Sequence, residues 1–333
     1  MRKMMLWGLC LGLCAVAYAG DVTMSKVAYG GWEDCVRLTN GEIELIATTQ
    51  VGPRVIRFGF VGGQNVFKEF EADLGQTGGD AWRPYGGHRL WHAPEAKPRT
   101  YSPDNGPVEW SWNKSRLVIT QPTEADTGIR KAMRIVMNPD MNHVRVEHIL
   151  TNENPWDVRL APWALTMMAP GGRGVFPQEF YRSHTEYLLP ARPLVLWHYT
   201  NMADPRWTWS AKYIQLRQDP EATDPEKVGF LNKQGWAAYV LNGEVFAKCF
   251  EAPDAEATYP DYNCNTETFT NAEILEVETL GPLTTLASEG GHVELVEDWY
   301  LFKADVGESD TAIDQHLAHE IQFMSLRGLP GSE

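Results

Sequence analysis

The sequence predicts an all-β protein, a large antiparallel β-sandwich, with one helix near the C-terminus. Three observations support the sandwich. Alternating segments are joined by two-residue turns at Asn40-Gly41 and Asn242-Gly243, and Asn-Gly supplies the positive φ that a tight hairpin requires. No strand pattern is followed by a helix in a βαβ rhythm. The 333 residues, 43% of them hydrophobic, suffice for the core of one large domain.

The first nineteen residues have the pattern of a secretory signal peptide. Arg2 and Lys3 give a basic start, residues 4–16 are apolar, and Ala17-Tyr18-Ala19 is a small-x-small cleavage site. The apolar run is too short for a stop-transfer helix, so no membrane span is expected. We therefore expect export to the periplasm or beyond, followed by one domain over residues 20–333 without repeats or linkers.

Strands are expected wherever short segments alternate between apolar and polar residues. In the first half they are residues 36–39, 42–47, 54–60, 108–112, 116–120, 129–137 and 143–150. In the second half they are residues 235–241, 244–250, 274–279 and 292–302. Residues 155–224 carry Pro, Trp and Arg at short intervals and are expected to be irregular. A helix is expected over residues 311–323, capped by Asp310, with Ile313, Leu317, Ile321 and Met324 on one stripe.

The net charge restricts the partners that the protein can bind, and the cysteines bear on the compartment in which it folds. The formal charge is -15, from 44 acidic and 29 basic residues, so a nucleic acid would be repelled. Thirteen Trp suit stacking on sugar rings, although core packing explains them equally well. After residue 19 the cysteines are Cys35, Cys249 and Cys264. A bridge between Cys249 and Cys264 is the candidate disulfide in an oxidising compartment, and it would add about 3 kcal/mol of stability.

The most reactive segment is residues 85–95, where Gly86-Gly87 precedes His88, Arg89, Trp91 and His92. Gly-Gly and Pro94 bracket too few residues for a helix, so an extended segment is expected. Alternation then places His88 and His92 on one face and Arg89 and Trp91 on the other. The histidines can supply a proton donor, or they can be ordinary hydrogen-bonded loop residues.

A zinc site made of His88, His92 and Glu95 is the weaker alternative, because the helical spacing of an HExxH motif is missing. No metal and no cofactor are therefore expected.

A pair of carboxylates lies on one predicted strand. Glu276 and Glu278 alternate with Leu275, Val277 and Thr279, so both acids face one way. Two neighbouring carboxylates repel, which raises the pKa of the more buried one and makes it a usable general base. The alternative is the polar outer face of an ordinary amphipathic strand.

The order of these motifs resembles the galactose mutarotase-like superfamily, and within it the bacterial DUF4380 branch. The similar stretches cover nearly the whole chain after residue 20: residues 40–45 with 52–56, residues 86–92, residues 150–152, residues 276–278 and residues 294–301. The resemblance implies that Glu278 takes the proton of the anomeric hydroxyl while His88 or His92 protonates the ring oxygen. The set expected to bind substrate is Arg83, Arg89, Trp91, Trp163, Glu267 and Glu276. One departure is that the chain has Pro162 to Thr166 where the family's enzymes have a second histidine.

Three functions remain open from the sequence. The first is an exported enzyme acting on a sugar's anomeric centre, most simply an aldose 1-epimerase. The second is a non-catalytic protein that binds a sugar or oligosaccharide. The third is a polysaccharide hydrolase or lyase, in which Arg83, Arg89 and Arg182 grip uronate carboxylates. A fold shared by all three cannot separate them.

Overall fold

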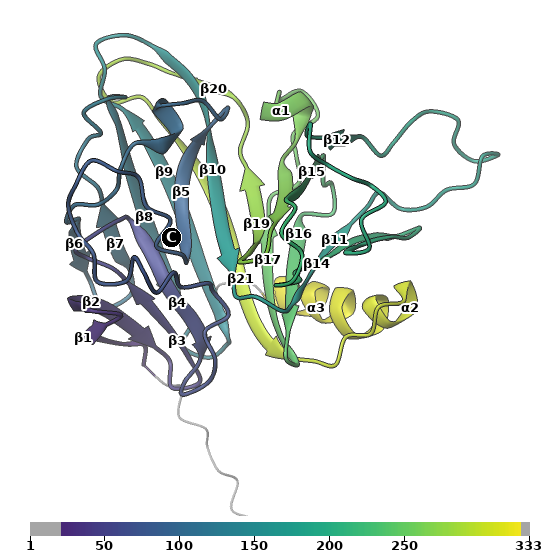
Figure 1. The fold of residues 1–333 in the computed structure, drawn as a ribbon, viewed down its shortest axis with the longest axis horizontal. Coiled ribbons are helices and arrows are strands. Elements are labelled where there is room, and N and C mark those ends of the chain that lie inside the picture. The colour runs from purple at the N-terminus through teal and green to yellow at the C-terminus, as the bar shows by residue number, and fades with distance from the viewer. Residues whose placement is uncertain (1–20, 328–333) are drawn as a thin grey trace, which may run out of the picture.

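The computed structural model describes residues 21–327 and contains two large antiparallel sheets packed face to face (Figure 1). The predicted sandwich with a C-terminal helix is confirmed. The predicted signal peptide, residues 1–19, lies outside the described residues. Between residues 21 and 327, no helix combines the length and the apolar character needed to cross a bilayer.

The first sheet has 11 strands, in the order β1-β2-β3-β4-β5-β10-β19-β18-β15-β12, with β20 also paired to β10. Their bounds are β1 (Thr23–Tyr29), β2 (Trp32–Thr39), β3 (Ile43–Ala47), β4 (Arg54–Phe60), β5 (His88–Ala93), β10 (Val158–Met168), β12 (Leu194–Leu196), β15 (Glu226–Phe230), β18 (Thr266–Thr270), β19 (Leu275–Leu280) and β20 (Thr284–Leu286). A 3-10 turn, η1 (Arg99–Tyr101), follows β5, and the short α1 (Pro260–Asn263) precedes β18.

The second sheet has 10 strands, in the order β13-β14-β11-β16-β17-β21-β9-β8-β7-β6. Their bounds are β6 (Glu109–Trp112), β7 (Leu117–Thr120), β8 (Ile129–Met137), β9 (His143–Asn152), β11 (Arg173–Pro177), β13 (Trp207–Trp209), β14 (Tyr213–Arg217), β16 (Trp236–Leu241), β17 (Glu244–Phe250) and β21 (His292–Lys303).

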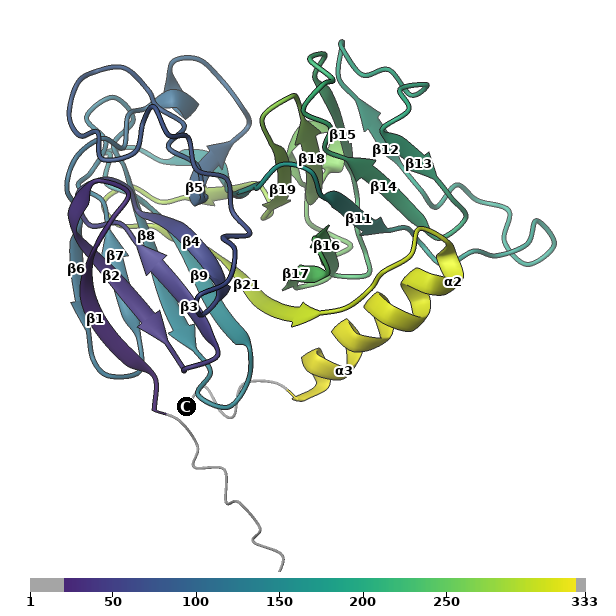
Figure 2. The same cartoon turned by 60° about the horizontal axis from the view of Figure 1, so that its bottom comes forward.

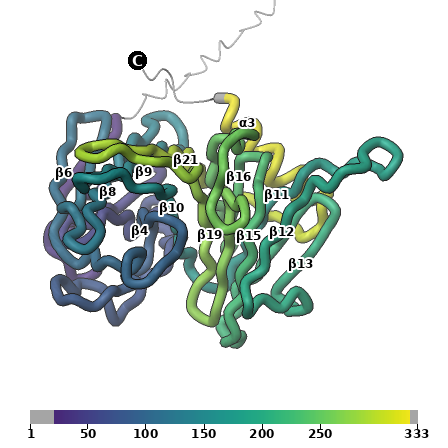
Figure 3. The backbone as a smooth tube through the Cα atoms, turned by 90° about the horizontal axis from the view of Figure 1, so that it is seen from above, coloured from purple at the N-terminus to yellow at the C-terminus, as the bar shows by residue number. Residues whose placement is uncertain are grey.

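Two long strands join the halves of the molecule. β10 pairs with β5 on one side and β19 on the other, and β21 likewise pairs with β9 and β17. Seen from above, β21 runs from the half that holds β6, β8 and β9 to the half that holds β11, β15 and β16 (Figure 3).

The core between the sheets follows from strand alternation. Inward side chains form one large apolar cluster, at whose centre Phe58, Phe67, Phe246 and Trp299 meet with ring centroids 5.3 to 6.0 Å apart. Edge-on aromatic packing of this kind is favourable beyond the area it buries. The packing of these four rings sets the distance between the two sheets.

The C-terminal helix covers the outer face of the second sheet. It runs through α2 (Asp310–Ile313), the π-type turn η2 (Asp314–Ala318) and α3 (His319–Arg327), and lies along that sheet in Figure 2. Ile313, Leu317 and Ile321 are buried against strands β11, β16 and β17, as their stripe predicts. The predicted cap is wrong by one residue, because Ser309, not Asp310, accepts from the amide of Ala312.

The prediction of an irregular middle is wrong. Residues 155–224 contain β10 through β14, and β10 is the central strand of the first sheet. Burial on both faces removes the polar alternation that marks a half-exposed strand, so β10 shows a nearly continuous apolar run with one Pro. The long loop between β11 and β12 projects from the molecule (Figure 2).

The predicted disulfide is not formed. Cys249 lies on β17 in the second sheet, whereas Cys264 precedes β18 in the first sheet, and both are free thiols, as is Cys35. Cys264 Sγ lies 3.0 Å from the carbonyl oxygen of Asp261. Burial raises the pKa of Cys35 to about 11 and that of Cys249 to about 12, so these two thiols resist oxidation.

We predict that all three thiols react when the chain without residues 1–19 is unfolded in guanidinium chloride with no reductant. A colorimetric thiol count of one, rising to three after reduction, would show instead that two of the cysteines are bridged.

Candidate functional site

Five adjacent strands of the first sheet place polar and aromatic side chains on the face that points away from the core. Leu165 of β10 lies opposite Arg89 of β5 on one side and Glu278 of β19 on the other. Glu278 in turn lies opposite Glu267 of β18. Residues directly opposite in an antiparallel ladder share a face, so all four point the same way. Two further cross-strand neighbours on this face are Trp91 and Trp163.

A buried lysine joins two of the carboxylates. Lys227 Nζ lies 2.8 Å from Glu267 Oε2 and 3.1 Å from Glu278 Oε2. The indole of Trp163 donates to Glu278 Oε2 at 2.9 Å. The ammonium also lies 4.9 Å and 4.8 Å from the ring centroids of Trp163 and Trp197. Burial lowers the pKa of Lys227, but the charges of Glu267 and Glu278 outweigh it and hold that pKa well above its ordinary value.

Three carboxyl groups thus face two cations, Lys227 and Arg89. Burial raises the pKa of Glu267 to about 8, with Lys227 opposing the shift and Glu278 adding to it. Burial and the charge of Glu278 raise the pKa of Glu276 to about 7, against the opposing charge of Arg89. One carboxyl group on this face therefore keeps a proton near neutral pH. A proton acceptor and a proton donor stand side by side.

Aromatic rings surround the guanidinium of Arg89. Its central carbon lies 4.2 Å from the ring centroid of Trp91 and 4.7 Å from that of Trp82. Tyr101 packs against both indoles, and Trp91 meets Trp163 edge-on at 5.4 Å. Arg89 is only 3% exposed. The result is an aromatic wall beside the carboxylates, formed by Trp82, Trp91, Tyr101 and Trp163.

The two predicted catalytic histidines lie on the other face of the same sheet. His88 lies opposite Thr166, and His92 opposite Pro162, so both side chains point between the sheets, where each is fully buried. The structure does not bring them to Glu278. The alternation predicted from the sequence is correct, and it is what separates them from Arg89 and Trp91.

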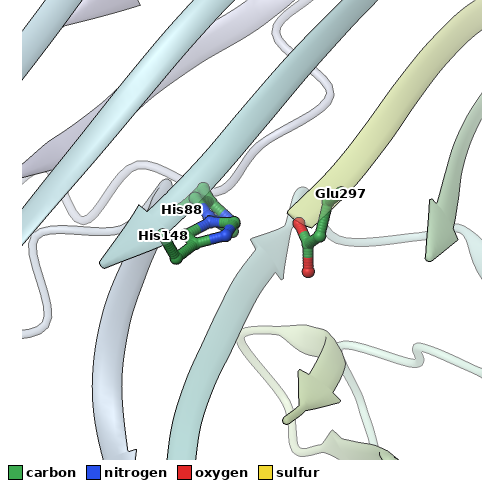
Figure 4. Close-up of side chains that lie close together, drawn as sticks. All are labelled: His88, His148 and Glu297. Atoms are coloured by element: carbon green, nitrogen blue, oxygen red, sulfur yellow. The ribbon is translucent and has the colours of Figure 1, made fainter. Parts of the chain in front are cut away.

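His88 belongs to a polar network in the core, together with His148 of β9 and Glu297 of β21 (Figure 4). The Nε2 atoms of the two imidazoles are 2.6 Å apart, and His148 Nδ1 lies 2.9 Å from the carbonyl oxygen of Leu295. Because a carbonyl only accepts, His148 carries its proton on Nδ1 and accepts from His88 through Nε2. The Thr166 hydroxyl then donates to His88 Nδ1 at 2.8 Å.

Glu297 is held by three donors. Lys248 Nζ lies 2.8 Å from Oε1, the indole of Trp299 donates to Oε2 at 2.7 Å, and the Thr279 hydroxyl donates to Oε1. His88, His148 and Glu297 offer ligand atoms within 4.8 Å of one another, which is the composition of a metal site. Each of these atoms already has a protein partner, however, and Lys248 supplies the balancing charge. The network is complete without an ion.

His92 has a separate partner. Its Nε2 lies 3.4 Å from Glu124 Oε2, and Lys131 Nζ lies 2.5 Å from Glu124 Oε1. Glu95, the third member of the weaker zinc alternative, is exposed and accepts from the Tyr101 hydroxyl. His88, His92 and Glu95 therefore do not form one ligand set.

The other predicted site residues also fall into two groups, one on the face of Glu278 and one away from it. Glu267, Glu276, Arg89, Trp91 and Trp163 all lie on the face of Glu278. The structure places Arg83 in the loop before β5, where its guanidinium donates to the carbonyl oxygen of Gly78 at 3.0 Å, outside the carboxylate cluster.

Two contributors were not predicted, Lys227 and Trp197. No strand was predicted over residues 226–230, although Lys227 and Gly229 alternate there with Val228 and Phe230. The sequence signal that could have identified Lys227 is a lysine within a short segment that otherwise alternates like a strand.

The comparisons with known proteins bear on the fold. No protein-family model and no curated protein matches this chain. Among solved structures, a galactose mutarotase-like protein from Lactobacillus casei superimposes with a TM-score of 0.52 at 10% identity, over 80% of this chain and 100% of its own. The chain has the galactose mutarotase-like fold. A candidate aldose 1-epimerase from Klebsiella pneumoniae gives 0.51 at 13% identity, over 92% of this chain and 88% of its own.

A third structure shares only part of its length. A TPR-domain containing protein from Parabacteroides distasonis gives a TM-score of 0.53 at 12% identity, over 82% of this chain and 48% of that one. Identities this low establish the fold alone. The fold is thus similar to that of galactose mutarotase-like proteins, while the DUF4380 assignment has no support beyond the sequence motifs.

The core network generates a stability prediction. Lys248→Met leaves Glu297 buried without its counter-charge, which should lower the free energy of unfolding by about 3–5 kcal/mol. Adding Glu297→Gln removes the charge, while the amide oxygen can still accept from Trp299 and the amide N–H can donate to the Thr279 hydroxyl, so the double variant should be more stable than Lys248→Met alone.

The measurement is urea unfolding, with the exposed Lys303→Met as a control expected to cost less than about 1 kcal/mol. A single variant as stable as the wild type would mean that the Lys248–Glu297 pair contributes nothing.

Proposed function

We propose that this protein is a carbohydrate-active enzyme that acts on the anomeric centre of a sugar, in the manner of an aldose 1-epimerase. The observation that supports it is the group of Glu267, Glu276 and Glu278 beside the aromatic wall, on the outward face of the sheet. Indole faces suit the apolar C–H surface of a sugar ring. Paired carboxyl groups suit proton transfer at its oxygens.

The proposed chemistry uses two carboxyl groups in place of a glutamate and a histidine. Glu278 takes the proton of the anomeric hydroxyl while Glu276 gives its proton to the ring oxygen, and the bond between the anomeric carbon and the ring oxygen breaks. The carbonyl group so formed rotates, and the ring closes with both proton transfers reversed. Lys227 and Trp163 position Glu278, since both donate to its carboxylate.

We also propose that the protein is exported. The basic start, the apolar run and the small-x-small site in residues 1–19 support this.

A non-catalytic sugar-binding protein is the second candidate. The observation that favours it is that neither predicted histidine lies on the face of Glu278. Such a protein would keep the aromatic wall and bind sugars without accelerating their interconversion.

The base is tested by Glu278→Gln. Because positioned proton transfer by one side chain contributes about 10²- to 10⁴-fold, the variant should lose roughly that factor in catalysed mutarotation with little change in sugar affinity. Polarimetry or anomeric NMR on freshly dissolved aldoses measures the rate. The matched control is Glu273→Gln, an exposed acid before the same strand. A wild-type protein that binds sugars but never exceeds the uncatalysed rate would be the non-catalytic candidate.

The acid is tested by pH. Because the pKa of Glu276 is raised to about 7, the carboxyl group keeps its proton below that pH and loses it above. We expect kcat/KM to fall as pH rises through about 7, approaching tenfold per unit, and this limb to vanish in Glu276→Gln. A pH–rate profile that is level from pH 6 to 9 would exclude Glu276 as the donor.

A further inference from the structure

The guanidinium of Arg89 is buried without an acceptor. Its Nε and Nη1 atoms are inaccessible to solvent and have no hydrogen-bond partner, while the ring centroids of Trp82 and Trp91 lie 4.7 Å and 4.2 Å from its central carbon. A buried donor without a partner costs about 1–3 kcal/mol, more when it is charged, so native proteins rarely keep one. The missing acceptor on a sugar-binding face points to a ligand.

Neighbouring groups do not supply that acceptor. Arg54 of β4 lies directly opposite Arg89, and its own guanidinium takes Asp104 at 2.6 Å and the carbonyl oxygen of Gly86 at 2.6 Å. The charge of Glu276 raises the pKa of Arg89, against the burial that lowers it. Within residues 21–327, however, no carboxylate lies within ion-pair distance of Arg89. Asp104 is thus the ion-pair partner of Arg54, and Arg89 has no such partner among the described residues.

The register sets the distance from Arg89 to the proposed base. Both residues lie opposite Leu165, so they stand on one line across the sheet, two inter-strand spacings or about 10 Å apart at the backbone. Leu165 lies between them on the same face, and the edge-on pair Trp91 and Trp163 runs alongside. A pyranose ring above Leu165 would present its anomeric hydroxyl to Glu278 and the substituent of C5 to Arg89.

We propose that Arg89 forms a subsite for a carboxylate on the sugar, which makes hexuronates the substrate class. This rests on the proposed function for the orientation of the ring. Guanidinium groups bind planar carboxylates through parallel N–H···O bonds, so a carboxylate is the acceptor that Arg89 suits best. A phosphate dianion would bring a second negative charge towards Glu276 and Glu278.

The test compares sugars that differ only at C6. Calorimetry on the wild-type protein with glucuronate against glucose, and galacturonate against galactose, should give at least about tenfold tighter binding of each uronate. Glucose 6-phosphate is the third arm, and it should bind more weakly than glucuronate. In Arg89→Gln the uronate preference should disappear while affinity for the neutral sugar is retained. Arg116→Gln, at an exposed arginine in the turn between β6 and β7, should behave as the wild type.

Equal affinity of the wild type for uronate and neutral sugar would overturn the subsite, and so would a preference that survives in Arg89→Gln. Tighter binding of glucose 6-phosphate than of glucuronate would overturn the choice of a carboxylate. The wild-type comparison decides even if Arg89→Gln fails to fold. A preference for uronates without catalysed mutarotation would contradict the proposed enzyme and support the subsite. Catalysed mutarotation without a preference for uronates would support the enzyme and contradict the subsite.

Discussion

The two-residue period of the central strands is the constraint on which both faces of the first sheet depend. In β5 it sends His88 and His92 into the core and Arg89 and Trp91 outwards. Because β5, β10 and β19 are paired without a bulge, the same division runs across all three. A shift of one residue in either ladder would exchange the core network with the carboxylate cluster.

Each face is organised around a buried lysine. Lys248 balances Glu297 between the sheets, and Lys227 balances Glu267 and Glu278 on the outward face. The core pair is accompanied by hydrogen bonds that satisfy every polar atom around it, which makes it a closed structural unit. The outward cluster has more carboxyl groups than cations, and burial, together with the charge of Glu278, raises the pKa of Glu267 to about 8 and that of Glu276 to about 7. This difference in charge balance distinguishes the core network from the candidate site.

The placement of the histidines changes the chemistry that the fold can support. Because both imidazoles lie in the core, the proposed proton transfer on the outward face falls to Glu278 and to Glu276, whose pKa burial raises to about 7. Two acids two residues apart on one strand can exchange the roles of donor and acceptor when the reaction reverses. In the proposed function, the aromatic wall and Arg89 select the sugar.

The sequence by itself determined the local features: the hairpin at the Asn242-Gly243 turn, the alternation of β5 and β19, and the apolar stripe of Ile313, Leu317 and Ile321. These depend on the conformations of neighbouring residues, which the chain carries at short range. Only the tertiary structure decided which residues meet across strands. β10 has no local signature because both its faces are buried, and it is the strand that joins Arg89 to Glu278 through Leu165. The sequence therefore identified most of the site's side chains, but their partners, Lys227 for Glu278 and His148 for His88, followed from pairings between distant segments.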